Sequence, residues 1–366
     1  MGQMRDQAIH GALDYEELER LGLSPEGICD FSVNSNPYGP SPRVQQALAL
    51  VPVDRYPDRV CLGLRRVIQA YELGRVDLSL DAILCGNGTA ELIWAVARAF
   101  LRPEAKAAIL GPTFADYHVA SVAAGAAVVE SRASAAEQFQ LDMGAVTTWI
   151  EQERPSLLWL CNPNNPTGTW LDSHALSTLK DVCQKMSTVL VIDEAYRRFL
   201  MPQESFSAVE LVSPASDVPF LVLRSLTKDF ALAGVRLGYA VASPKVLEHV
   251  LPHLPSWSVN GFAQAAGIAA ITDRQHLATT LHELATQRDA FFSALAAYGL
   301  RIVPSRTHFC LIDVGDARSI RQQLLLKNLL VRDCTSFGLP SAIRVATRQR
   351  SEWQHLVHVL MEVLCA

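Results

Sequence analysis

The sequence predicts an α/β fold with a mainly parallel sheet, and two observations lead to this prediction. Five short apolar runs recur between about residue 80 and residue 245, and runs this continuous are expected of strands buried on both faces. Between the third and fourth runs, residues 172–186 place their apolar side chains on one helical face, behind a capping Asp172. The five runs cover residues 82–85, 107–110, 157–161, 189–192 and 220–223.

A polar cluster follows each of these runs, and most of the clusters contain Gly or Pro. In open α/β sheets, ligands bind just beyond the carboxyl ends of the strands. We therefore expect the five clusters to meet and form one site.

A chain of 366 residues is long enough for about two domains, each with its own core. We expect a large domain over residues 41–260 and a smaller α+β domain over residues 261–366, which begins with an Ala-rich helical stretch. Residues 1–40 are predicted to join the small domain, because the Pro-rich segment 36–42 is typical of an extended crossing segment.

Composition and charge exclude several classes of protein. A formal net charge of -5, without any block of like charges, argues against nucleic acid as a partner. The eight cysteines show no C-x-x-C spacing and no close His, so the sequence predicts neither a metal site nor a disulfide framework. No apolar signal segment or membrane-length apolar run is present, and we expect a cytoplasmic protein without a membrane anchor.

Lys228 follows the last apolar run and is one of only six lysines in the chain. Burial lowers the pKa of a lysine and leaves a neutral amine that can condense with a carbonyl. The neighbouring Ser225, Thr227 and Arg236 supply two hydroxyls and a guanidinium, which are groups that bind phosphate. An amine beside a phosphate site predicts pyridoxal phosphate (PLP), because PLP carries an aldehyde and a phosphate on one ring. The alternative is a surface lysine at the end of a strand.

Two other segments supply groups that a PLP site needs. The turn before Gly88, Thr89 and Ala90 opens a helix, and the free amides at a helix N-terminus bind anions. Asp193 ends an apolar run, where an unpaired carboxylate is costly, and a protonated pyridine nitrogen would be a suitable partner. A tight turn and a helix N-cap are the alternative interpretations of these two segments.

Three more side chains complete the predicted cofactor site. Asn165 and Tyr196 are placed to form hydrogen bonds with a ring hydroxyl, and Tyr117 is an aromatic residue that can stack on the ring. The alternative for Tyr117, as for Phe114, is packing in the core.

Four motifs occur in an order that resembles the fold-type-I PLP enzymes. They are Asn162-Pro-Asn-Asn-Pro-Thr-Gly168, Asp193-Glu-Ala-Tyr196, Ser225-Leu-Thr-Lys228 and Gly234-Val-Arg-Leu-Gly238. The likeness covers nearly the whole chain. More specifically, the sequence resembles the class I/II aminotransferase group that contains histidinol-phosphate aminotransferase and threonine-phosphate decarboxylase. The resemblance implies a large domain with a mixed, mainly parallel seven-stranded sheet between helices, and a smaller α+β domain.

The resemblance also implies roles for individual residues. Lys228 would bind PLP covalently, Asp193 would pair with the pyridine nitrogen, and Tyr117 would stack on the ring. Asn165 and Tyr196 would bind the ring oxygen. The phosphate would be held by Gly88, Thr89, Ala90, Ser225, Thr227 and Arg236. Tyr56 matches a family tyrosine that reaches the cofactor of the neighbouring subunit, so a homodimer with shared active sites is implied.

The small lobe carries candidate substrate contacts. Arg332 and Arg344 lie in strand-like runs, and two arginines near one pocket predict a small substrate with two anionic groups, such as a carboxylate and a phosphate. Surface ion pairing is the alternative for both arginines. His10, Gly11 and Asn34 are further candidate contacts from the N-terminal segment.

Within the group, the motifs favour threonine-phosphate decarboxylase, an enzyme of cobalamin side-chain biosynthesis. The shared motifs are His10-Gly11, Asp30-Phe-Ser-Val-Asn34, Leu223-Arg-Ser-Leu-Thr-Lys228 and Trp257-Ser-Val-Asn260. One departure is Ala12, which stands where that subgroup has a second glycine.

The sequence does not determine which of two reactions is catalysed. Decarboxylation breaks the bond from Cα to the carboxylate, and transamination removes the Cα proton, yet both use the same lysine and the same cofactor. The alternative function is therefore a histidinol-phosphate-type aminotransferase with a 2-oxo acid acceptor. A related PLP cyclase or lyase and a non-catalytic protein of the same fold are further alternatives.

Overall fold

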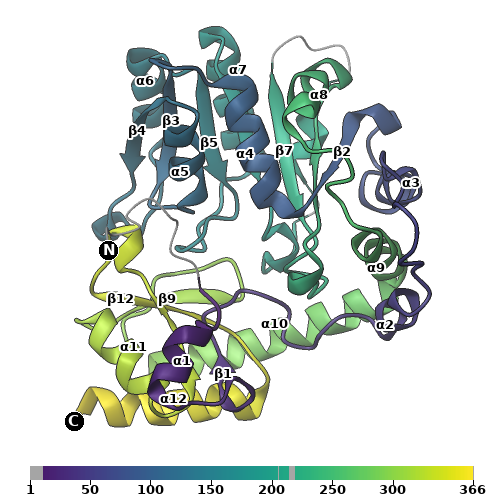
Figure 1. Ribbon diagram of the computed structural model, residues 1–366. Coiled ribbons are helices and arrows are strands. Elements are labelled where there is room, and N and C mark those ends of the chain that lie inside the picture. Colours follow the sequence, from purple (N-terminus) through teal and green to yellow (C-terminus); the bar gives the residue numbers. More distant parts are fainter. Residues whose placement is uncertain (1–10, 205, 214–218, 366) are drawn as a thin grey trace.

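A seven-stranded sheet forms the centre of the larger part of the molecule (Figure 1). The computed structural model describes residues 11–204, 206–213 and 219–365. The strand order is β2-β8-β7-β6-β5-β3-β4, and all neighbours are parallel except β8, which is antiparallel to both β2 and β7. This arrangement confirms the predicted α/β class with its mixed, mainly parallel sheet. The strands are β2 (Ile83–Gly86), β3 (Lys106–Gly111), β4 (Ala127–Arg132), β5 (Leu157–Cys161), β6 (Val189–Asp193), β7 (Phe220–Ser225) and β8 (Gly238–Val241).

All five predicted apolar runs are strands of this sheet, namely β2, β3, β5, β6 and β7. The pattern of apolar runs does not predict the other two strands, β4 and β8. β4 lies at the edge of the sheet and none of its residues is fully buried, so it lacks a continuous apolar run. β8 has only four residues and follows directly after the Lys228 segment.

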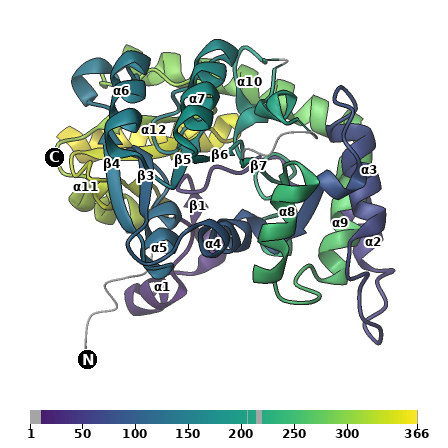
Figure 2. The ribbon, with the colours of Figure 1, turned by 90° about the horizontal axis from the view of Figure 1, so that it is seen from above.

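Helices cover both faces of the sheet (Figure 2). One face carries α4 (Gly88–Phe100), α5 (Asp116–Ala123) and α8 (Pro244–Val250), and the other carries α6 (Met143–Glu153) and α7 (Ser173–Met186). Asp172 caps α7 as predicted, since its carboxylate accepts a hydrogen bond from the backbone N–H of Ala175 at 2.9 Å. This sandwich buries both faces of the strands, which explains why their sequences are continuously apolar.

Three more helices pack together beside β2: α2 (Pro42–Leu48), α3 (Leu62–Glu72) and α9 (Gly261–Thr272). The predicted Ala-rich helical stretch consists of two helices, α9 and α10 (Arg274–Ala297). Asp273 separates them, because its carboxylate accepts from the backbone N–H of His276 and so caps a new helix.

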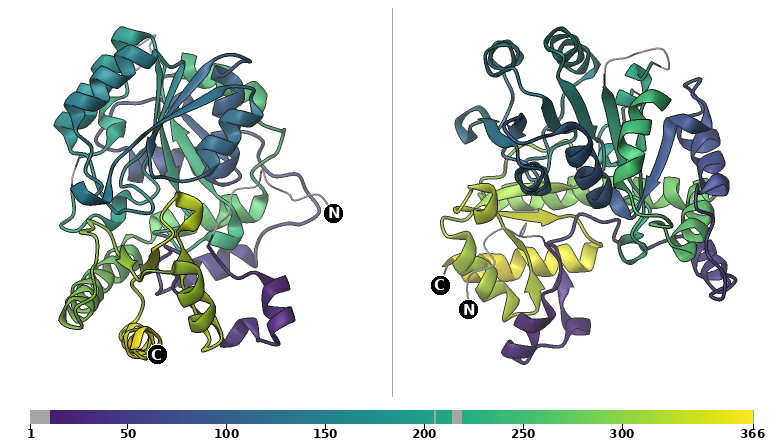
Figure 3. Two further views of the ribbon diagram at one scale, coloured as in Figure 1. Left: turned by 90° about the vertical axis from the view of Figure 1, so that its left-hand side faces the viewer. Right: turned by 45° about the horizontal axis from the view of Figure 1, so that its top comes forward.

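A smaller lobe lies below the large sheet (Figures 1 and 3). Its antiparallel sheet has the order β11-β12-β9, and β1 from the N-terminal segment pairs in parallel with β10. A second apolar core forms around these strands and helices. The division of the chain at residues 40 and 260 stays a prediction. The elements are α1 (Tyr15–Leu21), β1 (Cys29–Asp30), β9 (Phe309–Asp313), α11 (Ala317–Leu325), β10 (Leu329–Leu330), β11 (Arg332–Asp333), β12 (Ala342–Ala346) and α12 (Arg350–Cys365).

Within the described ranges, every helix is too short or too polar to cross a lipid bilayer.

Candidate active site

Two adjoining cavities lie where the large sheet meets the small lobe. The first, of about 120 Å³, is lined by residues at the carboxyl ends of β5, β6 and β7. The second, of about 200 Å³, adds residues of the N-terminal segment and the small lobe. Both are lined by Ala90, Phe114, Asn165, Tyr196, Lys228 and Arg236. The polar clusters that follow β5, β6 and β7 therefore meet in one site, as the strand pattern predicts.

Lys228 lies between the two cavities, three residues beyond the end of β7. Desolvation, together with the positive charges of Arg344 and Arg236, lowers the pKa of its ammonium from 10.5 to about 8. The carboxylate of Asp193 opposes this shift. Near neutral pH much more of this amine is therefore unprotonated than in a solvated lysine, and the unprotonated form is the one that attacks a carbonyl.

The N-terminus of α4 and Arg236 form a site suited to an anion. Gly88 has a φ of 78°, and a Cβ at this position would lie 2.8 Å from Nη2 of Arg236. Glycine therefore allows the guanidinium to lie directly against the first turn of the helix. Thr89, Ala90, Ser225 and Thr227 line the same cavity as Arg236, and such groups can bind a phosphate; their role as its ligands stays a prediction.

Asp193 ends β6 and is 4% exposed. Burial raises the pKa of its carboxyl to about 6, although the hydroxyl of Tyr117 and the backbone N–H of Ala195 donate to its two oxygens at 2.8 and 2.9 Å. A carboxylate accepts more than two hydrogen bonds, so Asp193 can still accept from a ring N–H in the cavity that it lines.

Tyr117 does not have the geometry predicted for it. It lines the first cavity, but its ring is fully buried and stacks on Trp159, with 5.2 Å between centroids and 11° between planes. Its hydroxyl is directed to Asp193. Phe114 lines both cavities and meets Tyr117 edge to face, so it is the aromatic ring that is exposed to the pocket.

Asn165 and Tyr196 both interact with Arg344. The side-chain oxygen of Asn165 accepts a hydrogen bond from Nη1 of Arg344. Burial raises the pKa of the Tyr196 hydroxyl, and the charge of Arg344 acts against that shift. The ammonium nitrogen of Lys228 lies 5.9 Å from the centroid of the Tyr196 ring.

Arg332 and Arg344 reach the second cavity from neighbouring strands, because they are direct partners in the β11–β12 pair. Arg344 is buried, and its Nη2 donates to the backbone carbonyl of Ser32, while its Nε has no partner among the described residues. Arg332 donates to the hydroxyl of Ser336 at 2.6 Å, and burial together with the charge of Arg344 lowers its pKa to about 10. Two buried guanidinium groups, both positively charged, attract an anion strongly.

The N-terminal segment closes the second cavity. Gly11 lines it, and a Cβ at Gly11 would lie 2.4 Å from the carbonyl oxygen of Ser32. Ala12 has a φ of 96°, a value that favours glycine, and its backbone N–H donates to the hydroxyl of Ser32 at 2.8 Å. Asn34 lines the cavity with both polar atoms of its buried side chain unpaired among the described residues. His10 lies outside the described residues.

Tyr56 lies away from the pocket of its own chain. It is 81% exposed, and its ring lies 4.8 Å from that of Trp257. Its predicted contact with a neighbouring subunit stays a prediction.

Several residues at the site are not among the predicted ones. Ser32, Phe114, Asp116 and Phe337 line the second cavity. Asp116 is adjacent to Tyr117, but a single Asp in the first turn of a helix is common for a structural reason, because it interacts favourably with the helix dipole.

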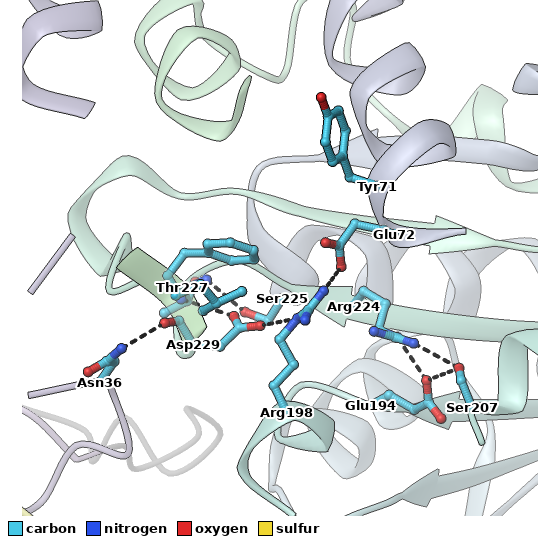
Figure 4. Close-up of polar contacts among 12 residues, drawn as sticks. Asn36, Tyr71, Glu72, Glu194, Arg198, Ser207, Arg224, Ser225, Thr227 and Asp229 are labelled. Atoms are coloured by element: carbon cyan, nitrogen blue, oxygen red, sulfur yellow. Dashed lines mark hydrogen bonds and ion pairs between the residues drawn. The ribbon is translucent and has the colours of Figure 1, made fainter. Parts of the chain in front are cut away.

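A network of buried ion pairs includes the residues that directly follow Asp193 and Lys228 in the chain (Figure 4). Next to Asp193, the carboxylate of Glu194 accepts from Nε of Arg224 at 2.7 Å and from the hydroxyl of Ser207 at 2.8 Å. Although burial alone would lower the pKa of Arg224, the carboxylate of Glu194 raises it. Next to Lys228, Asp229 forms an ion pair with Arg198. Both of the central pocket residues are therefore followed in the chain by a buried carboxylate that an arginine holds.

Comparisons with known proteins agree with this architecture. Residues 26–360 match the family described as aminotransferase class I and II. Histidinol-phosphate aminotransferase of Roseiflexus castenholzii is 34% identical over 357 residues, which cover 94% of this chain and 92% of the relative. Histidinol-phosphate aminotransferase of Symbiobacterium thermophilum is 34% identical over 356 residues, which cover 95% and 94%.

Two solved structures share the fold. Histidinol-phosphate aminotransferase from Sinorhizobium meliloti, in complex with pyridoxal-5'-phosphate, has a TM-score of 0.85 and 24% identity, covering 97% of this chain and 95% of its own. Aspartate aminotransferase from Thermus thermophilus, with maleate, has a TM-score of 0.82 and 22% identity, covering 95% and 94%. The predicted family is confirmed: this chain belongs to the class I and II aminotransferases.

Proposed function

We propose that this enzyme is a PLP-dependent aminotransferase that acts on a small phosphorylated amine of the histidinol-phosphate type, with a 2-oxo acid as acceptor. The observation that carries the proposal is the pair of buried arginines, Arg332 and Arg344, that line the same cavity as Lys228. The relatives of about one third identity bear the name of the aminotransferase alternative rather than that of the decarboxylase favoured by the motifs.

The residues of the first cavity fit PLP. Asp193 retains acceptor capacity in a buried position, and the close approach of Arg236 to Gly88 requires the absence of a Cβ there. We infer that Asp193 pairs with the pyridine nitrogen and that Asn165 and Tyr196 bind the ring oxygen. Phe114 replaces Tyr117 as the stacking residue in this assignment, because the ring of Tyr117 is stacked on Trp159.

The anion site at α4 would hold the cofactor phosphate. The contributing groups are Gly88, Thr89, Ala90, Ser225, Thr227 and Arg236. They combine helix N–H groups, hydroxyls and one guanidinium, which together neutralise a phosphate.

PLP, when bound, supplies an aldehyde that condenses with amines and a ring that withdraws electrons from the carbon next to the nitrogen. Lys228 supplies the amine that holds the cofactor, and its lowered pKa makes it able to accept a proton from the substrate Cα and to return one. Arg344 and Arg332 bind and orient the anionic groups of the two substrates, which are the phosphate of the amine and the carboxylates of the 2-oxo acid, and this orientation determines which bond at Cα faces Lys228. Asn34 and Gly11 line the same cavity as the two arginines.

Turnover assays with purified, PLP-loaded protein test the proposal. With histidinol phosphate and 2-oxoglutarate, we expect glutamate to form, and we expect Lys228→Ala to lower turnover by about 10²–10⁴-fold. Threonine phosphate supplied without a 2-oxo acid is the matched comparison. Release of carbon dioxide from it, without glutamate formation, would favour the decarboxylase and contradict the proposal.

We further propose that the enzyme acts as a homodimer in which Tyr56 reaches the partner's pocket. Leu50, Val53 and Tyr56 lie in one segment and are each more than 80% exposed, which is unusual for apolar side chains so close together. Sedimentation of the wild-type protein should give a mass of two chains, and Tyr56→Phe should weaken PLP binding without changing that mass. A monomeric wild-type protein with full activity would contradict this part of the proposal.

A further inference from the structure

One arginine holds both of the residues that follow Lys228 in the chain. Nε of Arg198 lies 3.0 Å from Oδ2 of Asp229, and its guanidinium lies 5.6 Å from the centroid of the Phe230 ring. The second oxygen of Asp229 accepts from the backbone N–H of Phe230 at 3.1 Å. Figure 4 shows Arg198 paired with Asp229. Asp229 and Phe230 are both buried, so this contact is shielded from water.

Arg198 is itself fixed from the opposite side. Its Nη2 pairs with the carboxylate of Glu72, whose side chain is 3% exposed. Arg274 reaches the same carboxylate from the surface, with 3.2 Å between Nη1 and Oε1. Burial alone would lower the pKa of Arg198, but the carboxylates of Glu72 and Asp229 raise it, so Arg198 stays charged.

The peptide between Lys228 and Asp229 is also held from the N-terminal segment. The backbone N–H of Asn36 donates to the carbonyl of Lys228 at 2.8 Å. The side-chain amide of Asn36 donates to the carbonyl of Asp229 at 3.1 Å and to the hydroxyl of Thr280 at 2.9 Å. Asn36 holds the main chain here, and Arg198 holds the side chain of the next residue.

The charge of Asp229 is not among the main charges that shift the pKa of the Lys228 amine. The charges that shift the pKa of Lys228 most are those of Arg344, Arg236 and Asp193. The Asp229 carboxylate instead faces Arg198, away from the cavity. Any influence of Arg198 on Lys228 therefore passes through the backbone.

A stabilising role alone is a weak explanation for these contacts. Taking two charges out of water costs about as much as their attraction returns, and buried ion pairs are often no more stable than apolar replacements. A buried pair does, however, define one geometry, and the position of a reacting amine matters strongly, since a displacement of about 1 Å can cost about 10²-fold in rate.

We propose that Arg198 is a positioning residue for Lys228: through Asp229 and Phe230 it fixes the backbone from which the lysine side chain reaches into the pocket. This inference rests on the proposed function, because it takes Lys228 as the amine that holds PLP and transfers the proton.

The test compares Asp229→Asn, Arg198→Met, Arg198→Lys and the double variant Arg198→Met/Asp229→Asn with the wild-type enzyme. Asp229→Asn keeps the shape of the side chain and removes only its charge, so it decides the question even if Arg198→Met does not fold. Arg274→Gln is the matched control, since it removes the exposed end of the same ionic chain. Three quantities are measured for each PLP-loaded protein: the pH midpoint of the visible absorption change, kcat and KM with histidinol phosphate and 2-oxoglutarate, and the melting temperature.

We expect Asp229→Asn and Arg198→Met to lower kcat by about 10-fold or more with KM changed by less than about 2-fold. Both should move the midpoint of the visible band by about half a pH unit or more, because the lysine nitrogen is displaced relative to its charged neighbours. The double variant should be no worse than the more severe single variant, since both changes break one contact. Arg198→Lys should recover part of kcat, and Arg274→Gln should match the wild type.

The inference is overturned if Asp229→Asn and Arg198→Met lose melting temperature while kcat and the band midpoint stay at wild-type values. Additive losses in the double variant would overturn it as well, because Arg198 would then act independently of Asp229. A wild-type protein without any visible band after PLP loading would remove the proposed function itself, and this inference with it.

Discussion

The pocket has two walls, and they differ in how their polar atoms are paired. The cofactor wall comes from the large sheet and includes Asp193 and Lys228 with their neighbours, and the substrate wall comes from the N-terminal segment and small lobe and includes Asn34 and Arg344. In the cofactor wall, both oxygens of Asp193 accept hydrogen bonds. In the substrate wall, neither Nε of Arg344 nor the side-chain amide of Asn34 forms a hydrogen bond of normal geometry among the described residues, although the amide lies close enough to the Tyr196 hydroxyl to lower its pKa.

This difference indicates which wall is complete before a small molecule arrives. Buried polar groups are normally paired, and each exception needs an explanation. A wall whose groups are paired within the protein keeps its shape by itself. A wall with unpaired buried groups gains most when a ligand supplies the partners, so the substrate wall should respond to ligand more than the cofactor wall does.

Removing Arg344 should have the largest effect. Arg344→Ala takes away a buried anchor for the anionic substrate, and we expect kcat/KM for histidinol phosphate to fall by about 10²–10³-fold. The PLP dissociation constant, measured by titration of the visible band, should change by less than about 5-fold, because Arg344 belongs to the substrate wall. Arg301→Ala is the control, since Arg301 is an exposed arginine of the same lobe that pairs with Asp313. Equal losses in substrate and PLP binding would show that the two walls are not separate.

The pH dependence of covalent PLP binding should show an effect of intermediate size. Desolvation and the charge of Arg344 lower the pKa of Lys228 from 10.5 to about 8, so the neutral amine becomes the major form above pH 8. The rate at which the apoprotein binds PLP covalently should therefore rise with pH, with its midpoint near pH 8 and a plateau about one pH unit higher. In Arg344→Ala the midpoint should move upward, because one neighbouring positive charge is gone. A midpoint near 10.5 in the wild type would mean that the amine is not desolvated.

Replacing one asparagine in each wall should have the smallest effects. The two replacements should change the free energy of unfolding in opposite directions. Asn34→Leu removes an unpaired buried amide, and we expect the unfolding free energy of the apoprotein to rise by about 1 kcal/mol. Asn165→Leu removes the acceptor of Arg344, and we expect a fall of about 2 kcal/mol. Urea denaturation of the two variants measures both changes. A destabilising Asn34→Leu would indicate that the amide has a partner in solution.

Much of the cofactor wall could be predicted from the sequence, because its residues follow apolar strands directly. Lys228, Asp193 and Asn165 each lie at or just beyond the carboxyl end of a predicted strand, and parallel neighbours bring such ends together. The substrate wall could be predicted mainly from the resemblance to a known family. Its residues Arg332 and Arg344 come from a separate lobe and become neighbours only through the pairing of two antiparallel strands.

The choice between Phe114 and Tyr117 could not be made from sequence. Both are aromatic and three residues apart, and only the packing of Tyr117 against Trp159 distinguishes them. The Arg198 network was also out of reach, because its partner Glu72 is separated from it by 126 positions and lies at the end of a helix whose charged residues have the pattern of a solvated surface.

The pairing of β1 with β10 has a consequence for the order in which the protein is assembled. Cys29 and Asp30 pair with Leu329 and Leu330, so the first strand to be synthesised waits for about 300 further residues before its partner exists. At about 5–20 residues per second, the ribosome needs roughly 15–60 s to supply them. The large sheet, whose seven strands end at Val241, is synthesised completely within that interval. The segment that carries Gly11 and Asn34 is thus the earliest part of the chain to emerge and among the last that can reach its place.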